Sequence, residues 1–239
     1  MTLKNPWEGG PGPDGLWISS VDRRRVDRYN ARLSTDDPTV VRYMTQGGRP
    51  LVPGAWSGNP WTAPIVLLLL NPAVSEYTDG MYSDPACLTR VADVAMGRWD
   101  PDYPNAWLHP EVRRHEPWCS RVVCGNLHRI LLDRGVGSEE AWSLLSQKIS
   151  VLELSPWVSH RWSVGAVVET TQLSVALAQN AMLDPKRTVL LGRGESIWRS
   201  VGLLDVDLLP MSTGVRGNQC RITQSNFSTA WGDILSHLT

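Results

Sequence analysis

Residues 64–70 constrain the fold more than any other segment of the chain. They have the sequence Pro-Ile-Val-Leu-Leu-Leu-Leu and are followed by Asn71-Pro72. A short apolar run with β-branched residues, bounded by turn-forming residues, is typical of a strand that is buried on both faces. Such strands belong to parallel sheets, because helices cover both faces of those sheets. The segment therefore predicts an α/β protein.

The rest of the chain continues this alternation of strands and helices, which predicts a central, mainly parallel four-stranded sheet with helices on both faces. We expect residues 71–118 to form a long irregular segment, of the kind that is often functional. Further strands are expected at residues 149–154, 188–191 and 206–209, and helices at 20–33, 120–134, 138–147, 164–182, 195–201 and 227–238, with a short one from Asp37-Pro38.

The length of 239 residues suits one large domain with its own core, so we expect a single α/β domain over residues 1–239. Residues 1–17 are rich in Gly and Pro and are predicted to form a flexible N-terminal arm. Residues 18–63 are expected as a lead-in of helix and loop.

Charge and cysteine content exclude some classes of protein. The net charge of −1 gives no overall basic field, although local clusters such as Arg23-Arg24-Arg25 leave room for a local nucleic-acid groove. The cysteines have no Cys-x-x-Cys spacing, so we expect no metal, no cofactor and the reduced thiols of a cytoplasmic protein. The N-terminus does not resemble a signal peptide, and the longest apolar run is too short for a bilayer, so no membrane partner is expected.

Polar residues follow the predicted strands, at the edge where open α/β sheets bind ligands. Asn71-Pro72 follows the first strand, and Glu153 lies in the apolar end of the second. A buried carboxyl group is costly unless it is paired or protonated. Residues 212–219 follow the fourth strand and combine small residues, glycines and an arginine, which suits a loop that approaches a phosphate.

Taken in this order, the motifs resemble those of the uracil-DNA glycosylase superfamily over roughly residues 50–235. The most similar branch is the single-strand-selective monofunctional enzymes and their bacterial relatives. Asn71-Pro72 matches the motif whose Asn positions the attacking water. Glu153 stands where the branch has a base-contacting Asn. Met211-Ser212 and Arg216-Gly217-Asn218 resemble the final His-Pro-Ser and Arg-Asn motif, without its His.

The resemblance implies a DNA glycosylase that cuts the bond between a flipped base and its sugar. DNA is the expected partner of a monomeric enzyme, and no protein partner or cofactor is expected. Since no lysine occupies a motif position, a lyase step is not expected. Tyr82 is the first candidate to stack on the base and Tyr77 the second. The implied site residues are Asn71 and Glu76 for catalysis, Pro72, Tyr77, Tyr82, Glu153, Ser155 and Pro156 for the substrate, and Ser212, Thr213, Arg216 and Asn218 for DNA.

The replacement of Asn by Glu153 affects which base the site accepts. An amide pairs with N3–H and O4 of uracil, whereas a carboxylate only accepts hydrogen bonds and repels O4. The N4 amino group of cytosine suits a carboxylate, and a carboxyl group protonated by burial could also donate to N3. We therefore expect a cytosine-type or modified base. Arg216 or a backbone N–H is expected to replace the missing His as stabiliser of the departing base.

The sequence leaves several alternatives open. The enzyme could repair uracil or other deaminated bases, or resemble antiviral glycosylases that remove modified cytosines from phage DNA. The chain could also be a non-catalytic nucleic-acid-binding module on the same fold. A third class is a nucleotide-binding hydrolase, in which Gly192-Arg193-Gly194-Glu195 would hold a phosphate at a helix start.

Overall fold

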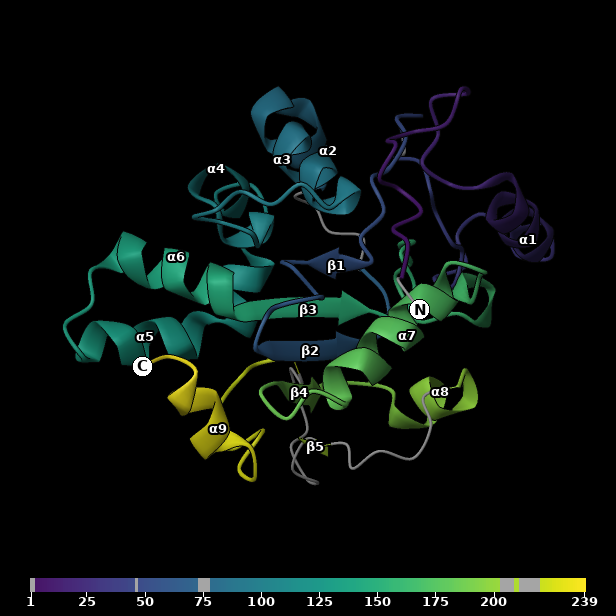
Figure 1. The fold of residues 1–239 in the computed structure, drawn as a ribbon. Coiled ribbons are helices and arrows are strands. Elements are labelled where there is room, and N and C mark those ends of the chain that lie inside the picture. Colours follow the sequence, from purple (N-terminus) through teal and green to yellow (C-terminus); the bar gives the residue numbers. More distant parts are fainter. Residues whose placement is uncertain (1–2, 46, 73–77, 203–208, 211–219) are drawn as a thin grey trace.

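The computed structural model describes residues 3–45, 47–72, 78–202, 209–210 and 220–239 (Figure 1). The described helices surround a single sheet. The α-helices are α1 (Ser20–Asn30), α2 (Thr78–Ser83), α3 (Pro85–Met96), α4 (Pro110–Arg113), α5 (Gly125–Asp133), α6 (Ser138–Lys148), α7 (Thr171–Met182), α8 (Glu195–Ser200) and α9 (Trp231–Ser236), with short 3₁₀ turns η1 (Ala106–Leu108) and η3 (Val164–Ala166) and a π-helical turn η2 (Cys119–Val123).

The sheet has the strand order β1-β3-β2-β4-β5. Its central strand β2 pairs in parallel with β3 and β4, and β5 continues in parallel beyond β4. On the opposite edge, β1 pairs with β3 in the antiparallel direction. The strands are β1 (Trp56–Ser57), β2 (Ile65–Leu69), β3 (Ile149–Glu153), β4 (Thr188–Leu191) and β5 (Leu209–Pro210).

The predicted α/β class and the mainly parallel pairing are confirmed, but the sheet is mixed. The four expected strands correspond to β2, β3, β4 and, at Leu209, to β5; residues 206–208 lie outside the described residues. The additional strand β1 was missed because two residues are too short to show an alternating pattern. It is held to the end of β3 by a hydrogen bond from the Glu153 N–H to the Ala55 carbonyl, 2.8 Å long.

Alternate residues of the strands face two different hydrophobic layers, as the two-residue period of a strand requires. In β2, Val66 and Leu68 contact the layer that contains α3 and α7, whereas Ile65, Leu67 and Leu69 contact the layer under α5, α6 and α9. Figure 1 shows α7 in front of the sheet, near the arrowheads of β2 and β3. The hairpin of α5 and α6 lies beside the opposite ends of these strands. Helices therefore cover both faces of the sheet, as the apolar run predicts.

The prediction of one irregular segment over residues 71–118 is wrong, since this region contains α2, α3, η1 and α4. The boundaries of α3 are set by local signals. The Asp84 side chain accepts hydrogen bonds from two N–H groups of the first turn, and Pro85 occupies the first helical position. Gly97 ends the helix with a φ of 79°, in the left-handed region that favours glycine. The short helix expected from Asp37-Pro38 is also absent, because that segment forms turns.

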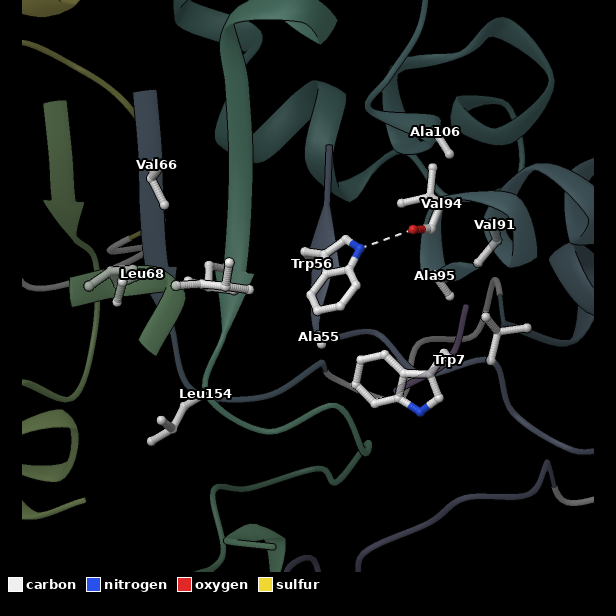
Figure 2. Packing of buried hydrophobic residues seen from close by; sticks show 14 of the residues in the cluster. Trp7, Ala55, Trp56, Val66, Leu68, Val91, Val94, Ala95, Ala106 and Leu154 are labelled. Carbon is white, nitrogen blue, oxygen red and sulfur yellow. Dashed lines mark hydrogen bonds between the residues drawn. The ribbon is translucent and has the colours of Figure 1, made fainter. Parts of the chain in front are cut away.

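The N-terminal segment contributes a side chain to the core, which its Gly- and Pro-rich composition does not indicate. Trp7 is only 3% exposed, and its ring lies 5.2 Å from that of Trp56. The Trp56 indole N–H donates to the Val94 carbonyl of α3 at 3.0 Å (Figure 2). Asn5 donates to the Ala95 carbonyl at 2.8 Å. The segment therefore joins β1 to α3.

We expect Trp7→Ala to lower the free energy of unfolding by about 3–5 kcal/mol, because a large buried ring is removed from a filled layer. Urea denaturation followed by circular dichroism measures this change. Leu183→Ala is the control, since Leu183 is 73% exposed and its loss is expected to cost less than about 0.5 kcal/mol. Equal effects of the two substitutions would contradict the packing of Trp7.

Among the residues that the structure describes, no helix is long and apolar enough to cross a membrane.

Candidate active site

A cavity of about 570 Å³ lies at the carboxyl ends of the parallel strands. Asn71 and Pro72 reach it from the end of β2, Glu153 from the end of β3, and Arg193 from the residues after β4. Leu69 and Glu153 are register partners in neighbouring strands, which brings the two strand ends together. This is the position at which open α/β sheets bind ligands.

Asn71 is held in place by the segment that follows β3. Its Nδ2 atom lies 3.1 Å from the Ser159 carbonyl oxygen, 3.0 Å from Ser159 Oγ and 3.0 Å from the Pro72 carbonyl oxygen. Two carbonyl oxygens can be contacted only by a donor, so the amide nitrogen must face them. The buried Ser159 hydroxyl donates in turn to the Arg161 carbonyl at 2.7 Å. The other polar atom of the amide, Oδ1, is an acceptor that suits a water molecule.

Glu153 is a buried carboxyl group at the end of β3. It is 7% exposed, and its Oε2 atom is buried without a hydrogen-bond partner in the described part of the chain. Burial raises the pKa of Glu153 to about 8, although the positive charge of Arg193 opposes this shift. At neutral pH the carboxyl group is therefore mainly protonated, and it can both donate and accept a hydrogen bond.

The turn after β4 brings Arg193 to the cavity. Gly192 precedes it and has no room for a side chain, because a Cβ there would lie 2.7 Å from Cδ2 of Leu69. Gly194 follows with a φ of 74°, which a glycine adopts without strain. Cys220 lines the cavity as well, and burial raises the pKa of its thiol to about 11, so that it remains neutral.

The other predicted substrate residues differ in position. Tyr82 lines the cavity from α2, and its hydroxyl oxygen accepts a 2.6 Å hydrogen bond from the Val52 N–H. Burial raises the pKa of Tyr82, so the phenol stays neutral. Ser155 and Pro156 are buried beneath the site and do not line this cavity. Their backbones hold the site together through two hydrogen bonds. The Ser155 N–H donates to the Leu70 carbonyl, and the Pro156 carbonyl accepts from the Gly54 N–H.

The remaining predicted residues lie outside the described residues. They are Glu76 and Tyr77, which follow β2 in the sequence, and Ser212, Thr213, Arg216 and Asn218, which follow β5.

Sequence reasoning missed Ser159, because it belongs to no motif and only the course of the chain after β3 brings it to Asn71. Arg193 was noted, but as part of a phosphate-binding turn and not as a neighbour of Glu153. Within the described ranges, no three His, Cys, Asp or Glu side chains lie close enough together to hold a metal ion.

The fold and the cavity define an open-sheet α/β protein with a candidate site at the strand ends. Comparison of the chain with protein-family models, with curated proteins and with solved structures finds no match. An assignment of function therefore depends on the site itself and on the motifs that form it.

Proposed function

We propose that this protein is a monofunctional DNA glycosylase that hydrolyses the bond between deoxyribose and a flipped, cytosine-type base. The observation that carries the proposal is the position of Asn71 and Glu153. These residues match two functional positions of the superfamily that the sequence resembles, and both line one cavity from neighbouring strands.

In this proposal Asn71 positions the attacking water through its amide oxygen, since its nitrogen is held by Ser159. Glu153 faces the Watson–Crick edge of the base, the edge by which flipped bases are usually recognised. The protonated carboxyl group matches cytosine, because one oxygen can donate to N3 and the other can accept from N4. N3 of cytosine is a stronger proton acceptor than O4 of uracil, so the pairing favours cytosine.

The size of the cavity supports a substituted base. Its volume of about 570 Å³ lies within the roughly 300–1,000 Å³ typical of small-molecule sites, and it exceeds what one pyrimidine ring fills. The residues that line the cavity also include Trp107 and Trp118, aromatic side chains of a kind that suits a ring or sugar substituent. A modified phage cytosine would occupy this space, which favours a role in antiviral defence.

An abasic-site assay tests the proposal. Single- and double-stranded oligonucleotides carrying uracil, cytosine, hydroxymethylcytosine or its glucosylated form are incubated with the protein and then cleaved with alkali. We expect strand cleavage at a cytosine-type base. Cleavage at uracil alone would identify a repair glycosylase, and no cleavage of any substrate would contradict the proposed function.

We further expect Ser159→Ala to slow excision by about fivefold, since one of the contacts that hold the Asn71 amide is lost, and a hydrogen bond of this kind contributes about 1 kcal/mol. Ser159→Thr keeps the hydroxyl and should retain most of the activity. Single-turnover rates with saturating enzyme measure the effect. Equal rates for the alanine variant and the wild-type protein would show that Ser159 does not position Asn71.

A further inference from the structure

We infer that Glu153 is a general acid, which donates its proton to ring nitrogen N3 of the departing base as the glycosidic bond breaks. This inference rests on the proposed function and assigns Glu153 a chemical step in addition to base recognition.

The geometry of Glu153 supports this role. The carboxyl group lies at the end of β3, almost completely removed from solvent, and it lines the same cavity as Asn71. Its Oε2 atom is buried without a partner among the described residues, although a buried polar atom of this kind costs about 1–3 kcal/mol. A ligand that fills the cavity and presents a ring nitrogen beside an amino group would satisfy both carboxyl oxygens. A carboxyl group whose Oε2 atom has no partner among the described residues is therefore suited to a bound base.

The proposed step balances in atoms and charge. The bond between C1′ and N1 breaks, and its electron pair moves into the base. The Glu153 proton moves to N3, so the base leaves as a neutral molecule and Glu153 becomes a carboxylate. The water that Asn71 holds adds its oxygen to C1′, and its surplus proton returns to Glu153 through solvent. The products are an abasic sugar and the free base.

This step accounts for the missing His of the final motif. A base that leaves as an anion needs a positive or hydrogen-bonding group to stabilise it. A base that is protonated during departure needs no such group, and the temporary charge resides on Glu153 instead. Arg193 is the positively charged neighbour whose field favours the ionised form of Glu153, and it would stabilise this carboxylate.

The charged and titratable groups around Glu153 are compatible with the role. The charge of Arg193 lowers the pKa of Glu153 against the effect of burial, and the charge of Glu153 acts in turn on the thiol of Cys220. The thiol of Cys220 and the phenol of Tyr82 are neutral at neutral pH, since burial raises both pKa values. Among the described residues, the cavity is also lined by the ionisable side chains of Glu116, His160 and Arg161.

The expected pH dependence follows from the raised pKa. A general acid acts in its protonated form, so activity should be constant below about pH 8, the pKa of Glu153. Above this value the rate should fall by about tenfold for each pH unit. An ordinary exposed glutamate, with a pKa of about 4.3, would already be ionised at neutral pH and could not act in this way.

The variant Glu153→Gln tests the inference. The glutamine amide can still donate to N3 and accept from N4, but it has no proton to transfer. We expect binding of an oligonucleotide with an uncleavable 2′-fluoro cytosine nucleotide to change by only a few-fold. Excision should fall by about 10²–10⁴-fold, and the residual rate should no longer decline above pH 8. His160→Gln is the control, because His160 is another ionisable side chain of the cavity. In this variant the excision rate should still decline above pH 8.

The possible outcomes separate the inference from the proposed function. A Glu153→Gln variant that excises as fast as the wild type would overturn the inference while leaving the glycosylase proposal intact. A wild-type protein without any excision would overturn both. A decline above pH 8 that persists in Glu153→Gln would assign the titration to another group and would also overturn the inference.

A substrate series on the wild-type protein gives a measurement that does not depend on the folding of a variant. Fluorine at C5 makes the base a better anionic leaving group but makes N3 less basic. If the base leaves as an anion, 5-fluorocytosine should be excised much faster than cytosine. Proton transfer to N3 predicts no such acceleration, because the two effects oppose each other. A marked acceleration would contradict the role of Glu153 as an acid.

Discussion

Replacing Asn71 with alanine is expected to lower the rate of base excision by about 10²–10⁴-fold, the usual range for a residue that activates or positions water. The structure gives the reason. The Asn71 nitrogen is fixed by Ser159, and in the proposed mechanism the amide oxygen holds the nucleophile beside the base. Alanine removes that acceptor.

The stability of Asn71→Ala should change much less than its activity. The lost hydrogen bonds between Asn71 and Ser159 join β2 to the segment after β3, so we expect a decrease of about 1–2 kcal/mol in the free energy of unfolding. Single-turnover excision and urea denaturation separate the two effects. Asn126→Ala in α5 is a matched control, because Asn126 is half-buried away from the cavity. Undiminished excision by Asn71→Ala would mean that another residue handles the water, and Glu76 would be the next to replace.

The strands that position the site were predictable because burial on both faces leaves a strong pattern in the sequence. β2 is a run of apolar residues, β3 and β4 are mostly apolar, and each strand was expected within one residue of its position. The rule that ligands bind at the carboxyl ends of such strands then selected Asn71 and Glu153. Both residues line the cavity because the rule depends only on strand direction and register.

The parts of the fold that the sequence did not predict depend on long-range contacts. β1 exists because Trp56 and Ser57 pair with β3, and nothing in two residues indicates a partner almost a hundred positions away. Ser159 contacts Asn71 only because residues 154–159 run beside the end of β2. The helix α3 differs, since Asp84, Pro85 and Gly97 are local signals that the prediction of an irregular segment overlooked.

The electrostatic state of Glu153 was predictable in direction but not in detail. A carboxyl group in an apolar strand end is expected to be protonated more easily than in water. The opposing influence of Arg193 depends on the turn of Gly192 and Gly194, which packs against Leu69 and Leu70 at the end of β2, and only the structure shows this. The residue type alone therefore suggests a carboxylate, whereas the burial of Glu153 in the structure favours a neutral acid at neutral pH.

The substitution Glu153→Asn is expected to reverse the preference of the enzyme from cytosine-type bases to uracil. The effect comes from the lost proton rather than from pairing. An amide donates one hydrogen bond and accepts another, so it can pair with N3–H and O4 of uracil as well as with N3 and N4 of cytosine. Loss of the acid slows the departure of cytosine, which is the poorer anionic leaving group. General-acid catalysis contributes about 10²–10⁴-fold, so the ratio of the two rates should change by a comparable factor.

The measurement is the ratio of single-turnover excision rates on oligonucleotides that differ only in the target base. Glu153→Gln is the matched control, because it has the same amide on a side chain as long as that of glutamate. If the glutamine variant also gains activity on uracil, the amide is responsible; if only the asparagine variant does, the space left by the shorter side chain contributes. Efficient removal of plain uracil by the wild-type protein, together with an unchanged ratio in Glu153→Asn, would show that Glu153 does not contact the base. The proposal of a cytosine-type substrate would then fail as well, and Arg193 would be the first side chain to test as the base contact, because it lines the cavity and its charge acts on Glu153.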